Sequence, residues 1–96
     1  MTRPTSITVN GVRIRIKYVK GLKDKYGHPL WGQCNTGKST ILLDEDQSVG
    51  RLEESLFHEI IHHLDDDLKL RLPESTIRRL SCALYGVLKS NTNLRF

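Results

Sequence analysis

The sequence predicts an α+β domain in which a small N-terminal β-sheet precedes two helices. Between residues 7 and 44, short runs of β-branched and aliphatic residues are separated by segments containing Gly, Asn and Pro, a pattern typical of strands and turns. From about residue 49 onward, apolar residues recur every three or four positions, as on one face of a helix. The chain has 96 residues, 38% of them hydrophobic, which suits one globular domain with a single modest core.

The first two strands are predicted to form a hairpin. Residues 7–9 and 12–19 flank Asn10-Gly11, a dipeptide that favours a tight primed turn. In the longer strand, apolar and basic side chains alternate, so one face is expected to pack on the core while the other lies in water. The apolar set is Val12, Ile14, Ile16 and Tyr18, and the basic set is Arg13, Arg15 and Lys17.

Two shorter strands are expected after a polar loop at residues 20–30. They comprise residues 31–35 and 38–44, joined around Thr36-Gly37. Gly37 is expected to supply a positive φ angle to this turn, because glycine adopts such angles without steric cost. The layout thus adds a second hairpin to the first.

The second hairpin also matches the phosphate-binding pattern G-x-x-x-x-G-K-[ST], from Gly32 to Ser39. A P-loop joins a buried strand to a helix, whose N-terminus then faces the phosphate. Here a proline-containing loop precedes the pattern, and a β-branched run leading into acidic residues follows it. We therefore interpret the match as a coincidence.

Two helices complete the predicted fold. The first is expected at residues 49–64, and the second at residues 73–90, since Pro73 suits a first helical position and Asn91 a left-handed cap. The apolar stripe of the first helix comprises Phe57, Ile60, Ile61 and Leu64. The expected core stripe of the second comprises Ile77, Leu80, Leu84, Val87 and Leu88, with Glu74, Ser81 and Tyr85 along one edge.

The first helix contains HEIIH at residues 58–62, which matches the metal-binding pattern HExxH. His58 and His62 lie one turn apart on the same side of a helix, where both imidazoles can bind one Zn²⁺ ion. Glu59 lies next to them, where its carboxylate can accept a proton from a metal-activated water that attacks a carbonyl. The pattern therefore predicts a zinc site with Glu59 as general base.

A hydrolytic zinc site needs a third protein ligand and an open fourth position. The extended pattern HExxHxxGxxH is absent, since Asp65 and Leu68 replace its Gly and final His. We expect Glu74 to be the third ligand, because it begins the second helix and would face the histidines if the helices pack through their apolar faces. Asp65 and Asp66 are the alternatives, as ligands or as hydrogen-bond partners of the histidines.

The remaining candidate residues carry weaker signals. His63 points about 100° away from the second histidine ligand and is expected at the surface or behind the ligands. Tyr85 either stabilises an oxyanion or packs with its hydroxyl in water. His28 is expected in a loop, and Cys34 and Cys82 are expected to be free thiols.

A family resemblance rests on residues 54–91, whose sequence is ESLFHEIIHHLDDDLKLRLPESTIRRLSCALYGVLKSN. It resembles the small gluzincin-type zincin metallopeptidases, particularly ImmA/IrrE-like domains and the minimal versions in phage and prokaryotic genomes. These share an LxHExxH helix, a short connection and a helix that opens with glutamate. More loosely, the resemblance covers about residues 7–91, in which TILLD is similar to the family's substrate-facing edge strand.

The resemblance implies a zinc metallopeptidase that hydrolyses peptide bonds. It matches His58 and His62 to the zinc-binding histidines, Glu59 to the general base and Glu74 to the third ligand. A protein or peptide substrate is then expected to pair as a strand with residues 39–44.

Two alternatives assign the chain a binding role instead. One is a catalytically silent zincin-fold module that binds protein, and the other is a nucleic-acid binder using Arg13, Arg15 and Lys17. Residues 1–50 carry eight Lys or Arg and four Asp or Glu, which suits the second, although a solvated strand face explains the same pattern. The N-terminus lacks the apolar region of a signal peptide and no apolar run could span a bilayer, so a cytoplasmic protein is expected.

Overall fold

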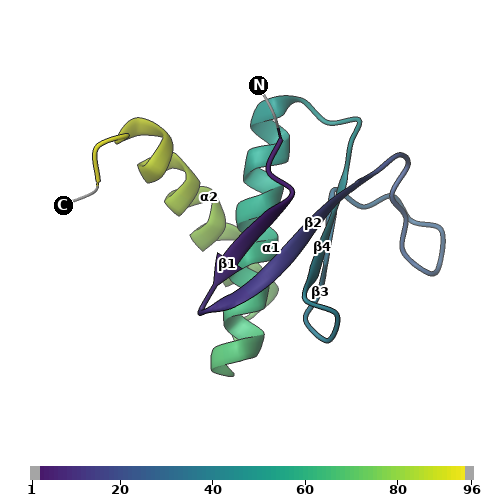
Figure 1. Ribbon diagram of the computed structural model, residues 1–96, viewed down its shortest axis with the longest axis horizontal. Helices are drawn as coiled ribbons and strands as arrows, with labels where there is room; N and C mark the ends of the chain where they lie inside the picture. Colours follow the sequence, from purple (N-terminus) through teal and green to yellow (C-terminus); the bar gives the residue numbers. More distant parts are fainter. Residues whose placement is uncertain (1–2, 95–96) are drawn as a thin grey trace.

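The fold is α+β, as predicted, with a four-stranded sheet followed by two helices (Figure 1). The computed structural model describes residues 3–94. Its elements are β1 (Ser6–Val9), β2 (Val12–Val19), β3 (Gly32–Asn35), β4 (Thr40–Asp44), α1 (Val49–Leu68) and α2 (Glu74–Ser90). Helix α1 lies against the sheet, and among these elements α2 packs only against α1. Neither described helix is long and apolar enough to cross a membrane.

The sheet is mixed, with strand order β1-β2-β4-β3. β1 and β2 form the expected hairpin, in which Asn10 and Gly11 have the positive φ angles of a primed turn, 53° and 78°. β4 pairs in parallel with β2 and antiparallel with β3. The prediction that residues 39–44 form a substrate-facing edge strand is therefore wrong, because both sides of β4 are already paired. The edge strand next to β4 is β3.

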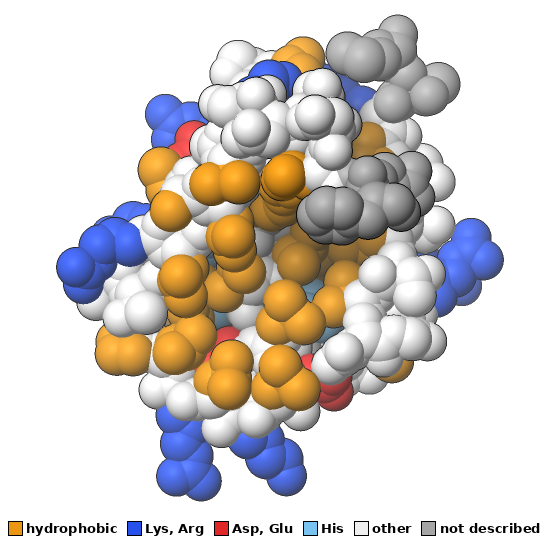
Figure 2. Space-filling model, turned by 90° about the vertical axis from the view of Figure 1, so that its left-hand side faces the viewer, with side chains coloured by type: hydrophobic (Ala, Val, Ile, Leu, Met, Phe, Trp, Pro, Cys, Tyr) orange, Lys and Arg blue, Asp and Glu red, His pale blue; other side chains and the backbone are white. Residues whose placement is uncertain are grey.

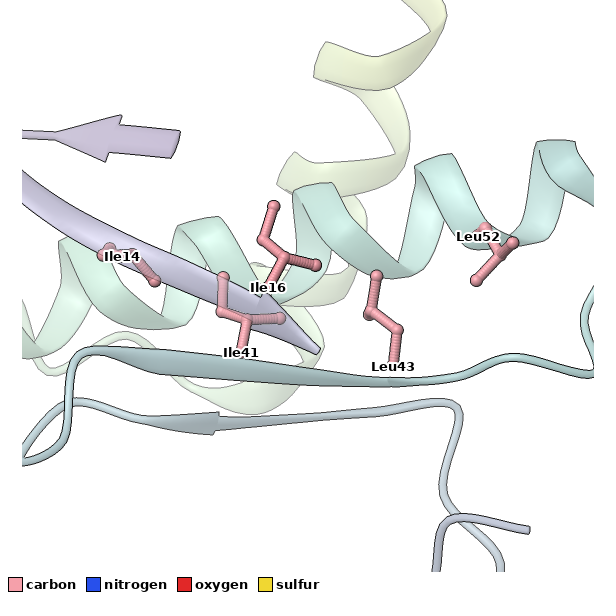
Figure 3. Packing of buried hydrophobic residues seen from close by; sticks show 5 residues of the cluster. All are labelled: Ile14, Ile16, Ile41, Leu43 and Leu52. Atoms are coloured by element: carbon pink, nitrogen blue, oxygen red, sulfur yellow. The ribbon is translucent and has the colours of Figure 1, made fainter. Parts of the chain in front are cut away.

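Five aliphatic side chains, each at most 6% exposed, form the core between the sheet and α1 (Figure 3). They are Ile14, Ile16, Ile41, Leu43 and Leu52. The predicted alternation in β2 holds for its two isoleucines, which are buried, and for the basic side chains that alternate with them, which are exposed. Val12, next to the turn, is 47% exposed because the core does not extend to the end of the hairpin.

The β3–β4 turn has a different geometry from the one predicted. Its positive φ angle, 48°, belongs to Ser39, and Gly37 does not have one. The Asn35 side chain holds the turn by accepting a hydrogen bond from the Lys38 backbone N–H at 3.1 Å. Because a strand follows Lys38 and Ser39 where a P-loop requires a helix, the phosphate-binding match is a coincidence of sequence.

Helix α1 begins as predicted but ends later. Ser48 is its N-cap, and the helix continues to Leu68 because no Gly or Pro interrupts the acidic segment after the HEIIH sequence. Its C-cap is Lys69, whose φ angle of 53° is left-handed. Asn91, the predicted left-handed cap of α2, has a φ angle of −133°, so that prediction is wrong.

Helix α2 packs through a different face from the one predicted. Of the expected core stripe only Ile77 is buried, and the other members are 41–49% exposed. These exposed residues are Leu80, Leu84, Val87 and Leu88. The contact with α1 runs instead along Ile77, Ser81 and Tyr85, because α2 has a single neighbour and cannot bury so wide a stripe against it. Figure 2, which views the side where α2 lies, shows apolar side chains gathered on that face.

Candidate metal centre

His58 and His62 of α1 face Glu74 at the start of α2. His58 Nε2 lies 2.9 Å from Glu74 Oε1, and His62 Nε2 lies 3.1 Å from Glu74 Oε2. The two Nε2 atoms are 3.2 Å apart. The three side chains offer ligand atoms that all lie within 4.8 Å of one another, so this group could hold a metal ion.

The neighbours of His58 prepare its ring for that role. Ser81 Oγ lies 3.4 Å from His58 Nδ1 and donates its own proton to the Arg78 carbonyl at 3.0 Å. The hydroxyl oxygen can therefore accept from Nδ1–H, and in that tautomer Nε2 would be free to bind a metal ion. Burial lowers the pKa of His58, although the charge of Glu74 opposes this shift. The lowered pKa favours the neutral imidazole, which is the form that binds a metal ion.

Glu59 is buried at 6% exposure, on the side of α1 that faces β3. Burial, together with the charge of Glu74, raises the pKa of Glu59 to about 7. Gly32 of β3 makes room for this carboxylate. A Cβ atom at Gly32 would lie 3.1 Å from Glu59 Cγ and 3.2 Å from Glu59 Oε2.

An open groove with a volume of about 670 Å³ passes over these residues. Its walls come from the loop before β3, from β3, from α1 and from the first turns of α2. Cys34 lines the groove, but burial and the nearby charge of Glu59 raise the pKa of its thiol to about 12. The thiol therefore stays protonated near neutral pH in the metal-free protein, and among the described residues Cys34 does not belong to the group formed by His58, His62 and Glu74.

A buried polar network that the sequence did not reveal holds one wall of the groove. The Gln47 side-chain amide donates 2.8 Å hydrogen bonds to the carbonyl oxygens of Trp31 and Asp44. Gln47 Oε1 accepts in turn from Ser55 Oγ at 2.9 Å. The backbone of Trp31 is thereby fixed to α1, while its side chain is 57% exposed at the groove.

The alternative acidic ligands lie elsewhere. Asp65 Oδ1 accepts a 2.8 Å hydrogen bond from the Leu72 backbone N–H and so shapes the connection between the helices. Asp66 is exposed and does not belong to the candidate metal-binding group found within residues 3–94. Of the three carboxylates considered, only Glu74 meets the histidines.

The structure also gives the positions of the residues that carried weaker signals in the sequence. The Tyr85 hydroxyl donates to Glu53 Oε1 at 3.1 Å and does not line the groove, so the oxyanion role is wrong. His63 is 6% exposed, not at the surface, and its Nε2 has no hydrogen-bond partner within residues 3–94. His28 lies in a loop beside Asp24, as expected, and both cysteines are free.

No protein-family model matches the chain, and neither a curated protein nor a solved structure matches it.

Proposed function

We propose that the protein is a zinc metallopeptidase that hydrolyses peptide bonds, with His58, His62 and Glu74 as zinc ligands and Glu59 as general base. The observation that carries the proposal is the convergence of the HEIIH histidines and Glu74 at the floor of an open groove. This arrangement agrees with the resemblance of residues 54–91 to small gluzincin-type zincins, including ImmA/IrrE-like domains.

The residues fit zinc in chemistry and in spacing. Two ligand atoms at 2.0–2.1 Å from a tetrahedral zinc ion lie roughly 3.3 Å apart. The three distances between His58, His62 and Glu74 range from 2.9 to 3.2 Å. Two imidazoles and one carboxylate form the ligand set of many catalytic zinc sites, and zinc bound there supplies a Lewis acid that activates water for attack on a carbonyl.

The chain's own residues supply the proton transfer. Glu59, at the groove floor, accepts the proton of the attacking water and can return it to the leaving amine. Its burial strengthens it as a base, because the pKa of about 7 lies near the working pH. Ser81 keeps the His58 ring in orientation, and Gly32 leaves the space that the Glu59 carboxylate occupies.

The substrate strand is expected to pair with β3 and not with β4. β3 has β4 on one side only, and its residues Gly32, Gln33 and Cys34 line the groove. A peptide added to this edge would run past Glu59 with its backbone hydrogen-bonded to the sheet. NMR titration with a peptide checks this proposal, because chemical-shift changes confined to β1 and β2 would contradict it.

The activity is tested with a screen of peptide hydrolysis by the zinc-loaded protein, beside its Glu59→Gln variant. We expect cleavage by the wild type and a loss of at least a hundredfold in the variant, which keeps its zinc because Glu59 is not a ligand. Cleavage that survives Glu59→Gln would contradict the assignment. Zinc binding without any turnover would favour a catalytically silent module that binds protein.

A basic hollow on the open face of the sheet favours a second candidate function, nucleic-acid binding. Arg13, Arg15, Lys17 and Lys38 line it together, and no acidic side chain of the described residues does. Four cations that contact phosphates predict a slope of log affinity against log salt of roughly −3 for single strands. An affinity for single-stranded DNA that is weak and independent of salt would exclude this function.

A further inference from the structure

We propose that the groove beside the metal centre selects peptides with an acidic side chain, and that Arg51, stacked on Trp31, is the residue that determines this specificity. The inference rests on the proposed peptidase function and names its substrate class. It concerns binding by residues that are neither metal ligands nor the general base.

Arg51 is held in place with its hydrogen-bonding edge available. Its guanidinium carbon lies 4.7 Å from the centroid of the Trp31 ring, within the range of a cation–π contact. A guanidinium stacked in this way keeps its in-plane N–H groups free to bind a carboxylate in bidentate geometry. Arg51 forms no ion pair with any residue between 3 and 94.

The backbone of Trp31, whose ring lies under Arg51, is fixed before any ligand binds. The Trp31 carbonyl accepts hydrogen bonds from the Asp44 backbone N–H at 2.9 Å and from the buried Gln47 side chain at 2.8 Å. Ser55 of α1 orients Gln47 in turn. Because this wall is already ordered, a substrate carboxylate would lose little affinity to ordering the site.

The other charges in the groove favour an anion as well. Arg78 also lines the groove and forms no ion pair among the described residues. Of the acidic residues that line it, Glu74 faces the histidines and Glu59 is buried below them. In the zinc-loaded protein the metal charge would offset that of Glu74, and Glu54 would oppose the two guanidinium groups, so a substrate carboxylate would gain attraction on balance.

The position of the acidic side chain follows from the geometry of α1. Arg51 precedes His58 by seven residues, which is about 10 Å along a helix axis. A peptide strand advances about 3.3 Å per residue. The acidic side chain is therefore expected about three residues from the peptide bond that lies over the metal centre, on the Trp31 side.

The test measures peptide binding by the zinc-loaded Glu59→Gln protein, so that turnover cannot interfere. The probes are capped octapeptides of Ala and Ser with one Asp at each position in turn, and matched peptides with Asn. Trp31 is the only tryptophan of the chain, so its fluorescence reports binding at this groove, and calorimetry gives an independent Kd. Arg51→Gln and Arg51→Lys are compared with Arg79→Gln, a control on an exposed arginine that does not line the groove.

We expect about tenfold tighter binding of the peptide with Asp at the favoured position than of its Asn counterpart. Arg51→Gln should reduce the preference to within about twofold, Arg51→Lys should keep part of it, and Arg79→Gln should leave it unchanged. Equal affinities for Asp and Asn peptides, a preference that survives Arg51→Gln, or no peptide binding would each overturn the inference. Selective binding without hydrolysis by the wild type would reject the peptidase activity alone.

Discussion

Single residues decide whether the histidine motif forms a usable site. Gly32 and Glu59 belong to different elements, yet the carboxylate occupies the space that a side chain at Gly32 would need. Ser81 lies 23 positions from His58 and contacts its ring. Neither partner is visible in the sequence, because a glycine in a strand and a serine at a stripe edge carry no signal until helices and sheet are placed.

Gly32→Ala is predicted to reduce turnover at least tenfold while zinc is retained. The added Cβ would lie 3.1 Å from Glu59 Cγ and from Leu43 Cδ2, and since both neighbours are buried, the Glu59 carboxylate must move. The matched control is Gly86→Ala on α2, where a Cβ meets nothing within 4 Å. Full activity in Gly32→Ala would show that the position of Glu59 does not depend on this contact.

Glu59→Gln is predicted to stabilise the metal-free protein at pH 8 by about 3 kcal/mol. The folded state raises the pKa of Glu59 from 4.5 to about 7, so it binds the proton more tightly than the unfolded chain does. The stabilising contribution of the Glu59 proton is therefore complete below about pH 4.5 and is lost as the pH rises toward 7. Urea unfolding at pH 5 and pH 8 measures this, with exposed Asp46→Asn as control. The prediction would be contradicted if the free energy of unfolding of the wild type rose between pH 5 and pH 8 and if Glu59→Gln did not increase it at pH 8.

Ser81→Ala is predicted to weaken zinc binding by about 10–100-fold. Loss of the hydroxyl removes the acceptor for His58 Nδ1–H, so the ring loses its preferred tautomer and orientation. Competition with a zinc chelator gives the affinity, and Ser90→Ala at the exposed end of α2 serves as the control. Identical affinities for the wild type and both variants would mean that the contact with His58 has no effect on the metal.

At the scale of elements, the periodicity of α2 predicted a helix but not the face that it buries. Its apolar residues span more of the circumference than one neighbouring helix can cover, so the sequence fits several rotations. The observed rotation brings Glu74 and Ser81 to the histidines and leaves Leu84 in solvent. The parallel pairing of β2 with β4 was equally hidden, because no short turn joins the two strands and fixes their register.

Ile77→Ala is predicted to lower the free energy of unfolding by about 2–4 kcal/mol, because the side chain is 2% exposed. Leu84→Ala removes a side chain that is 42% exposed, and it should cost less than about 1 kcal/mol. Urea denaturation of both variants measures the difference. A larger cost for Leu84→Ala would mean that α2 packs through the stripe first expected from the sequence and not along Ile77, Ser81 and Tyr85.

At the scale of the molecule, the sequence revealed the α+β order, the first hairpin and the three residues of the candidate metal centre. These follow from local patterns: alternation, the Asn-Gly turn and the HEIIH spacing. The groove could not be predicted from local patterns. The Gln47 network, the Trp31–Arg51 stack and the position of β3 at the sheet edge all depend on contacts between distant segments. The small core leaves many aliphatic side chains exposed, and α2 joins the rest of the fold through its contact with α1, to which Glu74 of the candidate metal centre belongs.

The zinc content per chain after exhaustive dialysis tests the three-ligand site most directly, in the wild type, Glu74→Ala and Lys38→Ala. We predict about one zinc ion per chain in the wild type and in Lys38→Ala, and its loss in Glu74→Ala. Lys38 is the matched control, since it belongs to the coincidental phosphate-binding match and lies in the β3–β4 turn. A wild type that retains no zinc, or a Glu74→Ala variant that retains all of it, would contradict the site described for His58, His62 and Glu74.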